Sequence, residues 1–197
     1  MSLAEAVSRI QQIQQMVKPP AAQQPATDQT GGAQFAGELQ SNMNAGNTSA
    51  ASGSVANKMV TLARTELAKG VKETNGNNDS SDIARYRTAT KGAAAGQPWC
   101  AYFVSYIARQ AGAPIGAGGS GLGYVPDITA WARSTDKFIP ASGQPKAGDV
   151  ILFPQHIGIV ESVNKDGSLN TIEGNHSDKV DRVHRNRSEA VGFLRLS

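Results

Sequence analysis

The segment GQPWCAYFVSYIARQAG, residues 96–112, contains Cys100, the only cysteine of the 197-residue chain. A lone cysteine can form neither an intramolecular disulfide nor a metal site built from several thiolates. The apolar residues that follow recur at steps of three and four, which predicts a helix with one buried face. Pro98 fits the first turn of this helix and Gly112 fits its end. The pattern therefore places Cys100 in the first turn, at the edge of the buried face.

A cysteine in this position has two interpretations. A free cysteine on an apolar helix face commonly packs as a small hydrophobic residue. The unpaired amides and the positive dipole end of the first turn, however, favour a thiolate. A backbone amide near Cys100 would also be available to stabilise an oxyanion. The second interpretation requires a base.

The chain offers three histidines as candidate bases, His156, His176 and His184. His156 begins the alternating segment HIGIVESV, residues 156–163, which predicts a strand with His156 on the face opposite the isoleucines. His176 and His184 are expected in loop or surface positions.

A hairpin after this strand would bring polar partners to His156. If NKDG, residues 164–167, forms a four-residue loop, Gly158 faces Glu173 and His156 faces Asn175 on the next strand. Gly158 would then leave space for the Glu173 side chain. A three-residue loop would turn Glu173 and Asn175 to the other face, so the argument depends on the register.

Cys100, His156 and a polar partner are the residue types that a thiol hydrolase needs. A histidine takes the thiol proton and later protonates the leaving amine. A carboxylate or amide on its second nitrogen fixes the ring tautomer and supports the imidazolium.

The order of predicted elements indicates an α+β domain. Helices are predicted at residues 55–69, 83–87 and 126–133, besides the one after Pro98. Strands are predicted at residues 150–153, 156–163, 169–174, 180–185 and 191–196. Short turns join these strands, so we expect an antiparallel sheet of five or six strands. AGGSGLG, residues 117–123, lacks the Lys-Ser/Thr pair of a phosphate loop and suits an active-site rim or a connector.

Residues 1–18 are predicted to form an amphipathic helix, and residues 19–54 a flexible linker rich in Ala, Gln, Gly and Ser. Residues 55–197 then form the globular domain. The apolar stripe of residues 2–17 is narrow. It would dock on its own domain, on a second copy or on a protein partner.

Bulk composition excludes several classes of protein. No apolar run reaches the length of a bilayer span, and the N-terminus lacks the basic start and apolar core of a secretory signal. If the protein acts outside the cytoplasm, we expect non-classical export, phage lysis or a secretion apparatus.

The net charge is +3. Part of this charge lies in DKVDRVHRNR, residues 178–187, which suits a solvated surface or a polyanion-binding surface, without any nucleic-acid motif.

The loop NGNNDSSD, residues 75–82, contains oxygen ligands that could hold calcium, Asn77, Asp79 and Asp82. It lacks the fixed spacing and closing glutamate of an EF-hand. Turn formation and helix capping explain these residues more simply, and we expect no cofactor and no metal.

Four segments together resemble the CHAP domain, the cysteine, histidine-dependent amidohydrolase/peptidase family related to the papain-like NlpC-type peptidases. They are GQPWCAYFVSYIARQAG, PKAGDVILF (145–153), HIGIVESV and TIEGN (171–175). The resemblance runs from about Val60 to the C-terminus and includes the order Cys, His, Glu-x-Asn.

The resemblance implies the roles of the candidate site residues. Cys100 would be the nucleophile and His156 the base, with Glu173 and Asn175 orienting the histidine or supporting the site. Trp99 and Phe153 would flank the substrate groove, and Gln97 would contact the substrate. The family usually cleaves peptidoglycan, either at the amide that joins sugar to stem peptide or within the peptides. The expected protein is therefore a bacterial or phage-derived hydrolase acting at the cell wall.

Two alternatives remain open. The same thiol site could act on another amide substrate, as in a toxin delivered to competitors. The chain could also be a non-enzymatic, wall-binding adaptor of a phage tail, a flagellum or a secretion apparatus. A Cys100 buried from solvent, or a His156 that points away from it, would favour the adaptor.

Overall fold

The computed structural model describes residues 53–196, and the predicted N-terminal helix and nearly all of the predicted linker lie outside this range. The helices are α3 (Val55–Ala68), α4 (Ser81–Arg87), α5 (Cys100–Gln110) and α6 (Val125–Ser134), with short 3-10 helices η1 (Ala117–Gly119) and η2 (Arg187–Glu189). The strands are β1 (Phe138–Pro140), β2 (Val150–Leu152), β3 (Ile157–Val163), β4 (Leu169–His176), β5 (Lys179–Arg185) and β6 (Gly192–Leu194).

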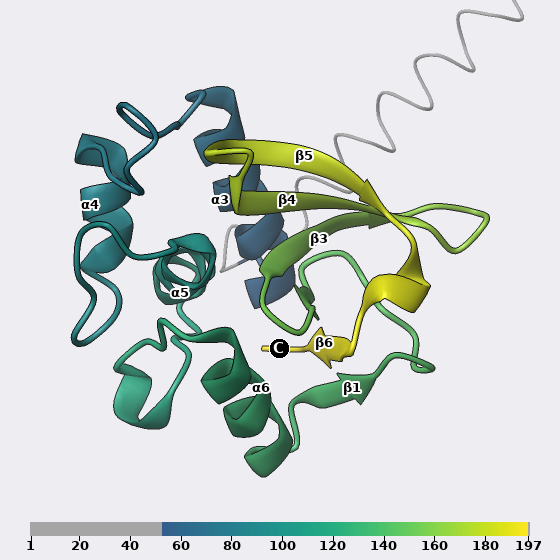
Figure 1. Cartoon of the computed structure of the whole chain (residues 1–197). Coiled ribbons are helices and arrows are strands. Elements are labelled where there is room, and N and C mark those ends of the chain that lie inside the picture. Colours follow the sequence, from purple (N-terminus) through teal and green to yellow (C-terminus); the bar gives the residue numbers. More distant parts are fainter. Residues whose placement is uncertain (1–52, 197) are drawn as a thin grey trace, which may run out of the picture. The chain divides into compact units, whose positions relative to one another are not determined.

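The strands form one antiparallel sheet in the order β1-β6-β2-β3-β4-β5 (Figure 1). Helices α3 and α5 pack against the β3–β5 half of the sheet. The α+β class and the papain-like arrangement expected from the sequence are confirmed. The strand β1 was not predicted. It has three residues and ends in Pro140 at the edge of the sheet, where a missing N–H is tolerated.

The pairing of β3 with β4 differs from the prediction near the turn and agrees with it near the site. Val163 pairs with Leu169, so the loop has five residues, 164–168, and the predicted four-residue loop is wrong. A bulge at Glu161 adds one residue to β3 and corrects the shift. Ile159 therefore pairs with Ile172, as predicted.

Helix α5 begins at Cys100, with Trp99 as its N-cap, and Gly112 follows its end with a φ of 87°. A positive φ is accessible to glycine without a steric penalty, which explains the stop. Pro98 precedes the N-cap and does not lie in the first turn as predicted. Residues 100–108 are all buried because α4, α3 and the sheet surround this helix.

The main core lies between the helices and the sheet. The residues of β2 and β3 alternate between this core, as Val150 and Ile159 do, and a smaller cluster that contains Ile151, Val160 and Phe193. Because both faces of β2 and β3 are buried, these strands give the candidate site a rigid support.

Candidate active site

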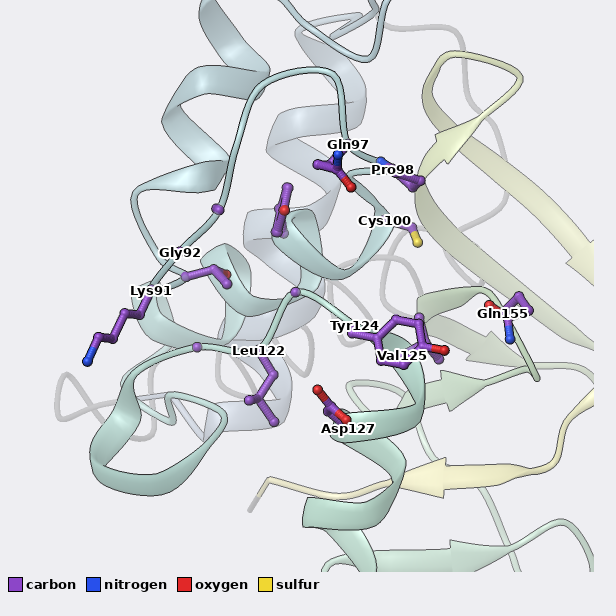
Figure 2. A pocket seen from close by; sticks show the side chains of 15 residues that line it. Lys91, Gly92, Gln97, Pro98, Cys100, Leu122, Tyr124, Val125, Asp127 and Gln155 are labelled. Atoms are coloured by element: carbon purple, nitrogen blue, oxygen red, sulfur yellow. The ribbon is translucent and has the colours of Figure 1, made fainter.

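Three elements bring Cys100, His156 and Glu173 together. Cys100 is the first residue of α5, His156 directly precedes β3, and Glu173 lies in β4. Because α5 packs on both β3 and β4, the start of the helix meets the strand pair. Cys100 is only 5% exposed, yet it lines a pocket of about 490 Å³, and Figure 2 shows its sulfur directed into this space. Cys100 is therefore buried, which was expected to favour the adaptor, but its sulfur faces a cavity.

The His156 ring is held by a carboxylate. Its Nε2 lies 2.8 Å from Glu173 Oε2. A Cβ placed on Gly158 would lie 2.6 Å from Glu173 Cγ, so the glycine provides the space in which the glutamate reaches the ring. With Nε2 engaged, Nδ1 is the ring nitrogen left for the thiol.

Glu173 is fully buried and its two oxygens are saturated with donors. Arg185 donates from Nε to Oε1 (2.9 Å) and from Nη2 to Oε2 (2.7 Å), and Thr171 Oγ1 donates to Oε1 at 2.6 Å. Burial raises the pKa of this carboxyl, but the donors from Arg185, His156 and Thr171 outweigh burial and lower the pKa to about 2. Glu173 is therefore an anion across the whole physiological range.

The same neighbours favour the protonated form of His156. Burial lowers the pKa of the ring, whereas Cys100 and Glu173 raise it, with a net result of about 9. The imidazolium therefore predominates at neutral pH, which suits a histidine that shares a proton with a thiol. Phe153 stacks on the ring at a centroid distance of 6.0 Å and limits its rotation.

The family comparison addresses the segment that contains this site. The family model of the CHAP domain matches residues 92–175, from just before α5 to Asn175. The chain contains a CHAP domain. Neither the curated proteins nor the solved structures gave a match.

A CHAP domain implies peptidoglycan-related amidase or peptidase activity and suggests action on the cell wall. Within residues 53–196, no helix is long and apolar enough to cross a bilayer.

Among the residues that the structure describes, Asn175 makes no hydrogen bond to His156. Its φ is 59°, and its Nδ2 donates to Asn78 Oδ1 at 3.2 Å. The pairing of β4 with β5 is irregular between Glu173 and His176, so the alternation that predicted Asn175 opposite His156 fails there. Of the two candidate orienting residues, Glu173 is the one that touches the ring.

Two hollows lie on either side of the Cys100–His156 pair. The first contains Cys100 and is lined by Gln97, the exposed Tyr124 and residues 121–123 of the glycine-rich loop. This loop thus forms a rim, one of its two predicted roles. The second, about 440 Å³, is lined by Phe153, His156, Asn175, His176 and Arg185. Gln155 lines both hollows, so they adjoin.

Trp99 does not flank this groove, contrary to the expectation. It is fully buried, and its Nε1 donates to Glu73 Oε1 at 2.9 Å. Its side chain lies in the main core, where Tyr86 stacks on it at a centroid distance of 5.9 Å. Trp99 thus supports the position of Cys100 from the core.

The basic segment 178–187 is in part the solvated surface that was predicted, since Lys179, Arg182 and His184 are exposed, but its arginines also bond other parts of the domain. Arg182 pairs with Glu161, and Arg185 pairs with Glu173. Arg187 donates to the carbonyls of residues 141 and 143. Arg185 was not predicted as a site residue because its partner, Glu173, lies 12 positions away on another strand. The available signal was Glu173 itself, because a buried carboxylate beside a histidine needs a cationic partner.

The loop at residues 75–82 uses its polar groups for local structure. Asp79 pairs with Arg87 at 2.7 Å, and Asp82 pairs with Arg85 at 3.0 Å. Asn77 Oδ1 accepts from the backbone N–H of Asp79. In the described part of the chain, no group of three or more His, Cys, Asp or Glu side chains is placed to hold a metal ion.

Proposed function

We propose that this chain is a cysteine-dependent peptidoglycan hydrolase, either an N-acetylmuramoyl-L-alanine amidase or a peptide endopeptidase. The observation that carries the proposal is the alignment of Cys100, His156 and the buried Glu173 beside an open groove. A histidine that lies between a carboxylate and a thiol, in a cleft, with a raised pKa, is typical of a functional site.

The reaction follows from this arrangement. The Cys100 thiolate attacks the carbonyl carbon of the scissile amide while His156 holds the proton. The backbone N–H of Cys100, at the start of α5, is free of an intrahelical acceptor and is available to the oxyanion. His156 then protonates the leaving nitrogen as the C–N bond breaks, which leaves an acyl-enzyme.

The second half of the reaction reverses the role of His156. The neutral ring removes a proton from water, which attacks the thioester and releases the acid product and the thiol. Glu173 stays ionised throughout, because its pKa of about 2 lies far below the working pH. The carboxylate therefore supports the imidazolium without taking its proton.

The test is a digest of purified peptidoglycan with the wild type, Cys100→Ala and His156→Ala, read by mass spectrometry of the released fragments. His184→Ala is the matched control, because His184 is exposed and, in the described part of the chain, its side chain makes one hydrogen bond, to Asn170 at 3.5 Å. We expect new fragments with the wild type and His184→Ala, and a loss of at least about 10³-fold with the other two. The new termini distinguish amidase from endopeptidase.

Unchanged digestion by Cys100→Ala would overturn the mechanism. An absence of fragments with the wild type, across several wall chemistries, would favour a toxin acting on another amide or a wall-binding adaptor.

A further inference from the structure

We propose that Arg185 is a positioning residue of the thiol site, which holds the His156 ring in one orientation by fixing both groups that flank it, Glu173 and Phe153. The inference rests on the proposed thiol hydrolase and extends it to a residue outside the four candidates. Arg185 lies in β5, beyond the part of the chain that matches the CHAP family model.

The first contact is a two-point ion pair. Two different guanidinium nitrogens of Arg185 bond the two oxygens of Glu173, at 2.9 and 2.7 Å. A fork of this kind fixes the plane of the carboxylate as well as its charge. The oxygen at 2.7 Å, Oε2, is also the one that receives His156 Nε2. Any rotation of the carboxylate that moved Oε2 off the ring would break the fork.

The second contact acts on the other side of the ring. The guanidinium carbon of Arg185 lies 4.8 Å from the centroid of Phe153, within the range of a cation–π contact. Phe153 in turn stacks on His156. One cation therefore holds both the carboxylate at the edge of the ring and the aromatic residue on its face. A lysine could supply the charge, but it has neither the fork nor the flat stacking surface.

The charged groups around Glu173 show why Arg185 matters more than its neighbours. Arg185 and Asp181 face it from β5, and His156 faces it from the segment before β3. Asp181 is a like charge. Arg185 is thus the one permanent cation among these groups, since a histidine loses its charge during turnover.

A second pair on the same strand provides a control, in which the glutamate, Glu161, also keeps an ion pair with Arg64 at 2.7 Å. Arg182 also makes a two-point contact, to Glu161, at 2.6 and 2.9 Å. Glu161 is nearly as buried as Glu173. This pair lies outside both hollows of the groove. Loss of either arginine therefore removes one β5 fork on a buried glutamate, and only one of them should change the thiol site.

The experiment compares wild type, Arg185→Gln, Arg185→Lys and Arg182→Gln in two assays on the full chain. The first is the pH dependence of Cys100 alkylation by iodoacetamide, which needs no peptidoglycan. The second is the steady-state rate of fragment release from peptidoglycan. Unfolding by urea is recorded for each variant.

In Arg185→Gln, the pKa of Glu173 should rise well above its wild-type value of about 2, because burial remains and the main donor is gone. A neutral Glu173 no longer supports the imidazolium, so the thiolate loses its partner as the pH falls. We expect the ratio of alkylation rates at pH 7 and pH 5 to be at least about fivefold larger than in Arg182→Gln. Arg185→Lys should keep the alkylation profile near wild type and lower kcat about tenfold, since it keeps the charge without the fork.

Equal alkylation profiles and equal kcat in Arg185→Gln and Arg182→Gln would overturn the proposal and leave Arg185 a purely structural residue. A wild-type kcat in Arg185→Lys would overturn the role of the fork. If Arg185→Gln does not fold, Arg185→Lys carries the test through kcat. If the wild type releases no fragments, the proposed function fails, while the alkylation profiles still decide the role of Arg185.

Discussion

His156 Nε2 and Glu173 Oε2 lie 2.8 Å apart, and this contact joins the segment before β3 to a fully buried position in β4. It couples the chemistry of the site to the stability of the sheet, because Glu173 is ionised inside the protein and depends on its partners. The interaction that orients the ring should therefore also make the free energy of unfolding depend on pH.

We expect the protein to lose stability in acid through Glu173. Its folded pKa of about 2 lies below the ordinary value of 4.5, so the contribution is fully present above pH 4.5 and is lost as the pH falls towards 2. The loss amounts to about 3 kcal/mol at most. Urea unfolding at several pH values checks this, with Glu173→Gln for comparison. An equally steep acid loss in the variant would assign the effect to other carboxylates.

The alkaline side should show the opposite linkage through His156. Its folded pKa of about 9 lies above the ordinary 6.5, so the contribution is fully present below pH 6.5 and is lost as the pH rises through 9. His156→Gln should therefore flatten the stability curve between these two values. The measurement is the midpoint of thermal unfolding from pH 6 to pH 10, and a curve parallel to that of the wild type would contradict the assignment.

Gly158→Ala should inactivate the site. The new methyl group would lie 2.6 Å from Glu173 Cγ, so the glutamate must move and its contact with His156 is broken. We expect kcat to fall by about 10²-fold, as for loss of a group that orients the base. Gly53→Ala is the control, since nothing lies within 4 Å of the added carbon there. Full activity of Gly158→Ala would show that the contact is dispensable.

Tyr124 is expected to bind substrate at the rim of the groove. It is 55% exposed, lines the hollow that contains Cys100, and makes no side-chain cap for α6. Tyr124→Ala should therefore raise KM by about fivefold with little change in kcat or in the unfolding midpoint, because only uniform binding is lost. Kinetics with a soluble muropeptide separate the two constants, and a selective fall in kcat would point to a different role.

Trp99→Phe should destabilise the fold and leave catalysis nearly intact. The change removes the donor to the buried Glu73 Oε1, which costs about 1–3 kcal/mol. Since Trp99 lies in the core, KM should stay within about twofold of the wild type. A large rise in KM, measured with the same muropeptide, would restore Trp99 to the groove.

The spacing of apolar residues along the sequence was sufficient to predict most of the helices and strands. The helix after Trp99 and the strands around Ile159 and Ile172 follow from apolar spacing, which reports directly on burial. The strand at Phe138–Pro140 was missed because three residues ending in proline carry no alternation. Its position at the sheet edge depends on β6, more than 50 residues later in the chain.

The positions of candidate site residues were predicted correctly only where the backbone has regular secondary structure. Glu173 lies in ordinary β geometry, so strand register placed it beside His156. Asn175 lies two residues later, where a positive φ turns its side chain towards Asn78. Arg185 sits in a basic segment whose partners come from other strands, so composition alone suggested solvent.

The bulge at Glu161 separates the length of the β3–β4 turn from the position of the site. Pairing on the site side of the bulge is the same as a four-residue loop would give, although the turn has five residues. The tip, residues 164–168, projects at the end of the sheet away from α5 (Figure 1). Protein engineering can use this separation: a peptide tag or a wall-targeting motif inserted at the tip would leave Glu173 facing His156.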